Sequence, residues 1–201
     1  MKSKKLVLIH NFPEFRQAYT YDCGASAMES VLAYFGFDVR EEEILKIAGT
    51  VKKGTALSGL KKVAKKFGLK FKEGKMNIAL LKKYIDEGKP AIIVLQAWRC
   101  EKVTNWKKHW DEGHYVVPIG YGNKKFYFAD PACFVRTYLS FDELDKRWHD
   151  TDGKKIFEHW GILFYGKKPK YSLNKAVHMD FDSYHNSGKL EWTYKRYKKI
   201  K

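Results

Sequence analysis

Apolar positions in the first half of the chain recur every three or four residues, which is the spacing of an amphipathic helix. The clearest segment is 24–34, which is followed by a terminating glycine at Gly36. Three further segments share this spacing and end close to a glycine, namely 40–48, 57–67 and 77–87. The pattern therefore predicts four successive helices.

The second half changes to a strand pattern. A short apolar run at 91–97 follows Pro90, and the segments 115–121 and 125–129 flank a turn at Gly122-Asn123, as in a β-hairpin. A helix over 141–148 and a strand over 160–165 complete the pattern. Helices first and an antiparallel sheet after them predict an α+β fold.

The composition suits one compact domain with an appendage. The chain has 201 residues, 44% of them apolar, which we divide into a domain over 1–166 and a basic, aromatic tail over 167–201. No apolar run is long enough to span a membrane, and the first residues lack a secretory cleavage site, so we expect a cytoplasmic protein. The connection 98–113 is unusually long, which is typical of a functional or disordered loop.

The net charge of the chain favours acidic partners as a class but does not identify a particular one. There are 39 Lys and Arg against 23 Asp and Glu, a net charge of +16, and many lysines fall on the polar side of the predicted helix 57–67. No zinc-finger spacing or ribonucleoprotein motif supports nucleic acid as the partner. Most of the charge is explained by solvated surfaces.

Motifs for phosphate and metal binding fail on inspection. The glycine-rich segment 49–55 lacks the lysine of a P-loop, and 120–122 leads into a strand where a dinucleotide site needs a helix. His109 and His114 are five positions apart, with Asp111 and Glu112 between them, but a third, distant ligand cannot be named. We expect neither a cofactor nor a metal.

A cysteine immediately before the first predicted helix is the candidate nucleophile. The three cysteines, Cys23, Cys100 and Cys133, cannot all pair within the chain. The helix dipole and free backbone amides at Cys23 favour the reactive thiolate. Gln17, six residues upstream, could supply an amide to an oxyanion formed beside the sulfur. The alternative is a buried structural cysteine.

The ends of the predicted hairpin could supply a base and its orienting carboxylate. His114 opens the first strand and Asp130 closes the second, so both lie at one edge of the sheet. A regular two-residue turn at Gly122-Asn123 would put them on opposite faces, so the pairing requires an extra loop residue or a bulge at Gly122. Pro118 inside the strand also indicates an edge or a bulge. His159 or His109 could replace His114 as the base, but neither has an aspartate as well placed.

These residues resemble the papain-like double-glycine leader peptidases, known as the processing domains of bacteriocin-exporting transporters. The resemblance covers about 16–165 and rests on six features in the family's order. They are Gln17 followed by five residues and Cys23-Gly24; Ala33-Tyr34-Phe35-Gly36; Gly54-Thr55 before a helix that ends in Phe67-Gly68-Leu69; Gly113-His114-Tyr115-Val116-Val117; Asp130-Pro131; and Ser140-Phe141-x-x-Leu144 followed by Trp148.

The resemblance implies a papain-like cysteine peptidase fold and a role for each candidate residue. Cys23 would be the nucleophile, His114 the general base and acid, Asp130 its orienting partner and Gln17 an oxyanion donor. The implied substrate is a peptide or protein, with cleavage after Gly-Gly in a narrow cleft. Because the chain shows no membrane span and no ATPase motif, a stand-alone domain is expected, and a separate transporter is a candidate partner whose existence the sequence does not show. The competing hypothesis is a non-catalytic papain-like module whose basic surface holds an acidic protein or nucleic acid.

Overall fold

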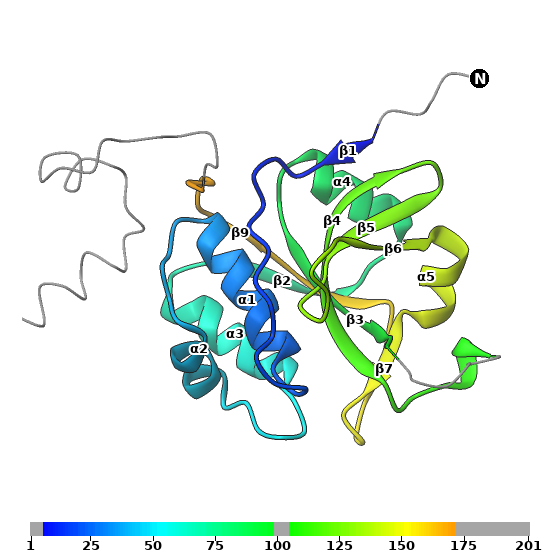
Figure 1. Ribbon diagram of the computed structural model, residues 1–201, viewed down its shortest axis with the longest axis horizontal. Helices are drawn as coiled ribbons and strands as arrows, with labels where there is room; N and C mark the ends of the chain where they lie inside the picture. Colours follow the sequence, from blue (N-terminus) through cyan, green and yellow to red (C-terminus); the bar gives the residue numbers. More distant parts are fainter. Residues whose placement is uncertain (1–5, 99–104, 172–201) are drawn as a thin grey trace, which may run out of the picture.

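The computed structural model describes residues 6–98 and 105–171 (Figure 1). Cys100 and most of the basic tail lie outside these residues, so the predicted boundary of the tail stays a prediction. The helices are α1 Cys23–Tyr34, α2 Glu41–Ala48, α3 Leu57–Lys66, α4 Ile78–Asp86, α5 Phe141–Arg147 and the short 3-10 helix η1 Trp106–Lys108. The strands are β1 Val7–Leu8, β2 Lys70–Lys75, β3 Ala91–Gln96, β4 Gly113–Gly122, β5 Lys125–Ala129, β6 Thr137–Ser140, β7 His149–Thr151, β8 Ile156–Glu158 and β9 Trp160–Tyr165.

Seven of these strands form one sheet, in the order β2-β9-β3-β4-β5-β6 with β1 paired to β4. Every strand pair is antiparallel, and β7 and β8 form a separate two-stranded ribbon. The first three helices gather on one side of the molecule in Figure 1 and α5 on the other. The predicted α+β fold, with N-terminal helices packed on an antiparallel sheet, is confirmed.

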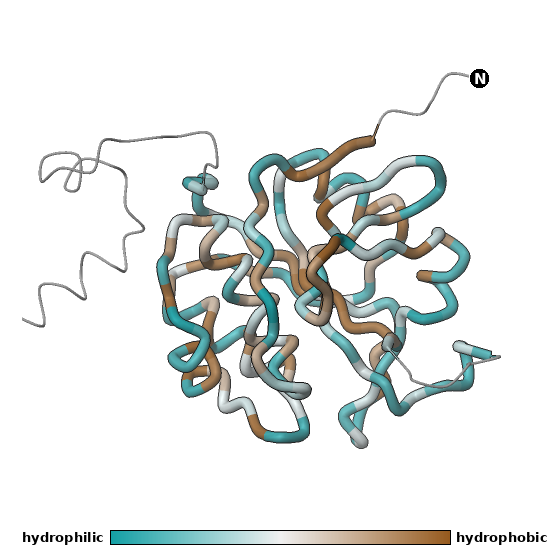
Figure 2. Tube along the Cα trace, in the orientation of Figure 1, coloured by the Kyte–Doolittle hydropathy of each residue, from teal (hydrophilic) through white to brown (hydrophobic). Residues whose placement is uncertain are grey.

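Helix α1 and the central strands form the core. All but one of the residues of α1 are buried, and the helix packs against β4, α2 and α3. All six residues of β3 are buried, which explains why the sequence of this strand is an apolar run rather than an alternating pattern. Hydrophobic stretches run through the middle of the molecule in Figure 2, the outer helices alternate between hydrophobic and hydrophilic residues, and the ribbon of β7 and β8 is mostly hydrophilic.

Several strands escape the sequence pattern because they lie at edges. Strand β2 carries three lysines and a glutamate among six residues, and it is held by pairing along its whole length with β9. Lysine on an edge strand discourages pairing with other chains, and it also hides the strand from a search for alternating apolar residues. Strands β1, β6, β7 and β8 have only two to four residues each.

The hairpin of β4 and β5 turns one residue later than predicted. Gly122 pairs with Lys125, so the turn residues are Asn123 and Lys124, both with positive φ, at 48° and 59°. Two left-handed residues form the type I′ turn that matches the twist of a hairpin. Pro118 lies within the sheet at an irregular point of β4, so the bulge expected there is present and the alternative of an edge strand is wrong.

The described start of the tail contacts the end of α1. The backbone amide of Lys170 donates to the carbonyl of Tyr34 at 3.0 Å. Among the helices of residues 6–98 and 105–171, none is both long enough and apolar enough to cross a bilayer.

Candidate active site

Helix α1 carries Cys23 as its first residue, and this side chain is only 8% exposed. The packing of α1 against β4 depends on the next residue, Gly24. A Cβ atom there would lie 2.8 Å from the Cβ of Thr55 and 3.0 Å from the ring of Tyr115, closer than side chains normally approach. Gly24 therefore allows the start of α1 to sit tightly against β4, which carries the candidate base.

A β-bulge brings His114 and Asp130 to the same face of the sheet. Near the turn, Gly120 pairs with Tyr127, but beyond Ile119 the register shifts so that Val117 pairs with Ala129. The extra residue is Ile119, which is buried, and its carbonyl accepts a 2.7 Å hydrogen bond from the amide of Ile9. The bulge is thus held in place by the chain segment that follows β1.

The register on either side of the bulge decides where the carboxylate lies. Continued without a bulge, the register near the turn would set Asp130 opposite Val117, three residues from His114 and on the other face. With the bulge, the same extrapolation sets Asp130 opposite Val116, two residues from His114 and on the same face. The irregularity predicted from the sequence is therefore present, but both predicted places, the loop and Gly122, are wrong, because the register shifts at Ile119.

His114 and Asp130 form a short, buried pair. His114 Nε2 lies 2.7 Å from Asp130 Oδ1, and the side chains are 8% and 3% exposed. Burial by itself would lower the pKa of His114, but hydrogen bonds to Asp130 and Cys23, together with the charges of both, raise it from 6.5 to about 9. Because Nε2 faces Asp130, Nδ1 is the ring nitrogen left for the sulfur. Cys23, His114 and Asp130 therefore form one continuous chain of interactions.

The carboxylate of Asp130 is bound on both oxygens. Oδ1 also accepts from the amide of Ala132 at 2.9 Å, and Oδ2 accepts from Trp98 Nε1 at 3.1 Å and Thr137 Oγ1 at 3.0 Å. Burial would raise the pKa of Asp130, but hydrogen bonds from His114, Ala132 and Thr137 outweigh it and lower the pKa. Sequence reasoning missed Thr137 and named Trp98 only as the start of a long loop.

Gln17 lies on the segment that leads into α1, where its backbone amide donates to the carbonyl of Pro131 at 3.0 Å. Its side-chain Nε2 donates to the carbonyl of Tyr19 at 2.7 Å, while Oε1 is buried and has no hydrogen-bond partner. The side chain is therefore engaged with its own loop in this structure. A role towards an oxyanion requires Nε2 to exchange the Tyr19 carbonyl for the substrate.

Asp22 is a structural element of the site that sequence reasoning did not single out. Its side chain is completely buried, and Oδ2 accepts from the backbone amides of Ala18 and Tyr19 at 3.0 and 2.9 Å. These bonds hold the loop between Gln17 and Cys23 in a fixed shape. The signal available in the sequence was an aspartate directly before the helix, although its carboxylate accepts from amides that precede it and makes no cap hydrogen bond to α1.

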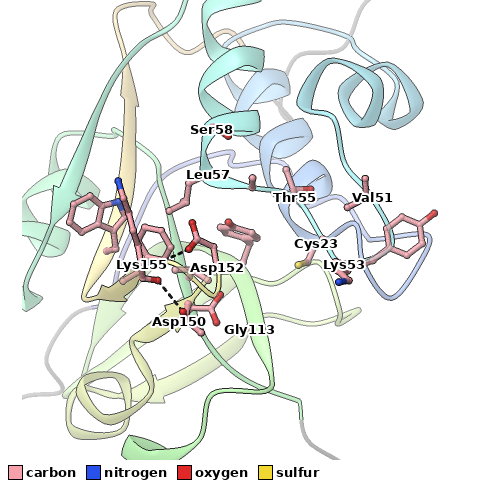
Figure 3. A pocket seen from close by; sticks show the side chains of 18 of the residues that line it. Cys23, Val51, Lys53, Thr55, Leu57, Ser58, Gly113, Asp150, Asp152 and Lys155 are labelled. Atoms are coloured by element: carbon pink, nitrogen blue, oxygen red, sulfur yellow. Dashed lines mark hydrogen bonds between the residues drawn. The ribbon is translucent and has the colours of Figure 1, made fainter.

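A cleft of about 650 Å³ opens beside Cys23. One wall is the connection between α2 and α3, residues 51–58, and the other is the ribbon of β7 and β8. Cys23 lies toward one end near Lys53, while Asp150 and Lys155 lie farther along (Figure 3). An extended peptide that entered this cleft would pass the sulfur.

The ribbon that walls the cleft is fixed to β3 by Gln96, which is completely buried. Its Nε2 donates to the carbonyl of His149 and to Asp150 Oδ1, both at 3.1 Å, and its Oε1 accepts from the amide of Glu112 at 2.9 Å. Asp150 also lies against Gly113, where a Cβ would come within 2.6 Å of its carboxylate. This wall of the cleft is therefore held against β3 and β4, with no space for a side chain at position 113.

The other candidate bases lie in different surroundings. His159 pairs with Asp145 of α5, with Nε2 3.3 Å from Oδ1, and the ring of His109 meets Trp106 edge-on. Cys23 is instead one of the groups that raise the pKa of His114. Among the described cysteines, Cys23 and Cys133 are both free.

A sequence model of the Peptidase C39 family matches residues 11–151. An uncharacterised protein of Methanothermobacter thermautotrophicus is 29% identical over 116 residues, 58% of this chain and 69% of that protein. An uncharacterised protein of Methanothermobacter marburgensis is 26% identical over 117 residues, 58% of this chain and 70% of its own length.

Solved structures share the fold at lower identity. The peptidase domain of Streptococcus ComA, a bifunctional ABC transporter involved in quorum sensing, superposes with a TM-score of 0.60 at 22% identity, covering 79% of this chain and 99% of that domain. A putative C39-like peptidase from Bacillus anthracis gives 0.63 at 16% identity over 82% and 99% of the two chains. A double glycine motif protease from an AMS/PCAT transporter, solved with its leader peptide, gives 0.56 at 24% over 83% and 99%. With its papain-like fold and a family match over most of its length, this chain belongs to the Peptidase C39 family.

Proposed function

We propose that this chain is a cysteine peptidase in which Cys23 attacks a peptide bond, His114 moves the protons and Asp130 orients the imidazole. The observation that carries the proposal is the buried line from Cys23 through His114 to Asp130, placed at a cleft that can take an extended peptide. A nucleophile, a base within reach and a third group that orients the base are the parts that covalent catalysis requires.

The reaction follows from this arrangement. An imidazolium at His114, held by Asp130, stabilises a thiolate at Cys23, and the sulfur attacks the carbonyl carbon. When the C–N bond breaks, His114 gives its proton to the departing amine, which leaves a thioester on Cys23. His114 then takes a proton from water, the resulting hydroxide attacks the thioester, and the carboxylic acid leaves as the thiol is restored.

The tetrahedral intermediates need donors for their oxyanion. The backbone amide of Cys23, at the positive end of α1, and Nε2 of Gln17 are the groups we assign to this role. The hydrogen bond from Gln17 to Tyr19 would be exchanged for one to the oxyanion. Loss of such a donor costs on the order of 10²-fold in turnover in other enzymes, and we expect the same of Gln17→Ala.

For the substrate we propose a leader peptide cut after Gly-Gly. The support is that one structural relative is described as a double glycine motif protease in complex with the leader peptide. Another relative belongs to a transporter, so we propose a separate transporter as partner. A free thiol nucleophile suits a reducing compartment, and we place the activity in the cytoplasm.

The first test is the reactivity of Cys23 without any substrate. Iodoacetamide alkylation at pH 6, read at each cysteine by peptide mass, should modify Cys23 far faster than Cys133, whose pKa is raised by burial and by Asp130. His114→Ala should remove the difference. Equal rates at Cys23 and Cys133 in the wild-type protein would contradict the peptidase and favour the non-catalytic binding module.

The second test is cleavage of peptides that contain Gly-Gly, with matched Ala-Ala peptides as controls. The wild-type protein should release the fragment that ends in Gly-Gly and should leave the Ala-Ala peptides intact. Cys23→Ala should abolish cleavage while the protein stays folded. Cleavage of both peptide sets would retain the peptidase and reject the Gly-Gly specificity.

A further inference from the structure

The carboxylate of Asp130 accepts four hydrogen bonds, two on each oxygen. Oδ1 binds His114 and the amide of Ala132, whereas Oδ2 accepts from Trp98 Nε1 and Thr137 Oγ1. A carboxylate offers about four acceptor positions, so this one is saturated. Its donors come from β4, from the turn after β5, from the end of β3 and from β6, which are far apart in sequence.

Trp98 reaches Asp130 from an unusual conformation. It lies just beyond the end of β3 with φ of 62°, a left-handed value that is rare and costly for a bulky residue. Its side chain is 52% exposed, although aromatic rings are normally buried. The hydrogen bond from the indole N–H to Asp130 explains both features, because Trp98 makes this bond from its strained and exposed position.

We propose that Trp98 and Thr137 are positioning residues that fix the carboxylate of Asp130 and, through it, the imidazole of His114. The inference rests on the proposed function and extends it to two side chains that are not among the residues lining the cleft beside Cys23. If only Oδ1 were hydrogen-bonded, the carboxylate could rotate about the Cβ–Cγ bond of Asp130. Two donors on Oδ2 set its plane, and the plane sets the direction in which Oδ1 meets Nε2.

The same two donors also support the charge of Asp130. Hydrogen bonds to an ionised acceptor favour the ionised form, and Thr137 is one of the groups that lower the pKa of Asp130. If either donor is lost, one acceptor position of a nearly buried carboxylate is left unsatisfied. The carboxylate then holds the imidazolium less strongly, and the pKa of His114 falls.

Four variants separate positioning from packing. Trp98→Phe keeps a ring and removes the N–H, while Thr137→Val keeps the shape and removes the hydroxyl. Thr137→Ser restores the hydroxyl and serves as the rescue. Trp106→Phe is the matched control in the same connection, because Trp106 stacks on Arg147 rather than contacting Asp130.

Two readouts on the full chain report on His114 directly. Proton NMR titration of the imidazole, assigned with His114→Gln, should show a pKa lower than wild type by about one pH unit in Trp98→Phe and Thr137→Val. Alkylation of Cys23 at pH 6 should slow by about tenfold in the same two variants. Thr137→Ser and Trp106→Phe should titrate and react as the wild-type protein does.

The outcomes distinguish this inference from the proposed function. If Cys23 of the wild-type protein reacts no faster than Cys133, the proposed function is rejected, and the inference that rests on it is rejected as well. If the wild-type advantage is present and depends on His114, but Trp98→Phe and Thr137→Val titrate as wild type, the inference alone is overturned. Equal shifts in all four variants, the Trp106 control included, would also overturn it, because they would report general loosening.

Discussion

The pair of Asp130 and His114 should make the stability of this fold depend on pH, and Asp130→Asn isolates that dependence. The raised pKa of His114 contributes stability that is fully present below about pH 6.5 and is lost as the pH rises through about 9. The lowered pKa of Asp130 contributes stability that is present above 3.8 and is lost as the pH falls below that value. Both residues therefore contribute their full stabilisation near pH 6, whereas the stabilisation from His114 is lost at pH 10.

The magnitude follows from the shift at His114. A rise from 6.5 to about 9 corresponds to about 3 kcal/mol of unfolding free energy. Cys23 shares in the shift, so we expect Asp130→Asn to remove about 2 kcal/mol at pH 6 that it does not remove at pH 10. The side chain of His114 is almost entirely buried, so solvent does not screen this interaction appreciably.

Urea unfolding followed by tryptophan fluorescence at pH 6 and pH 10 measures the effect. Effects of the substitution on the unfolding free energy that do not depend on pH cancel when the loss at pH 6 is compared with the loss at pH 10. Asp145→Asn is the matched control, because Asp145 pairs with His159 at 3.3 Å while both side chains are exposed, and such pairs contribute less than about 1 kcal/mol. The reasoning would be refuted if Asp130→Asn lost the same unfolding free energy at both pH values. It would also be refuted if the difference between the two losses were no larger than for Asp145→Asn.

Three further substitutions test how the fold supports the site. Gly24→Ala would press a methyl group against Thr55, so we expect a loss of about 1–3 kcal/mol in urea unfolding and slower alkylation of Cys23. Gly59→Ala would drive a Cβ into the carbonyl of Ala48 and should destabilise the fold by a similar 1–3 kcal/mol or so, but with Cys23 alkylation unchanged at low temperature. Ser140→Ala removes the capping box of α5 and should cost about 1 kcal/mol in the same unfolding assay without affecting alkylation; a slowed alkylation would show that α5 is coupled to the site.

The first half of the molecule could be predicted almost completely from local sequence. Helix propensity, glycine at helix ends and an apolar stripe act within one segment, so all four predicted helices are present within a few residues of their expected bounds. The position of Cys23 at the start of α1 follows from the same local signals. Strand β2 was missed because its polar sequence gains its strand form only by pairing with the distant β9.

The candidate site could be named from the sequence but not assembled from it. Cys23, His114 and Asp130 were each recognisable by type and placement, and the need for an irregular hairpin followed from the alternation of side chains along a strand. That Ile119 supplies the bulge depends on a bond to Ile9, more than 100 residues earlier in the chain. The sequence around Ile119 does not indicate that Ile9 will be its hydrogen-bond partner.

The sequence by itself therefore determined the four N-terminal helices, the family and the side chains that we propose to react, because these depend on residue type and local spacing. Only the tertiary structure decided the face on which Asp130 lies and the surroundings of its carboxylate. Trp98 and Thr137 meet at Oδ2 from opposite sides of Asp130 in the chain. Hydrogen bonds of this kind are chosen by distance and direction in the folded state, which sequence separation does not reveal.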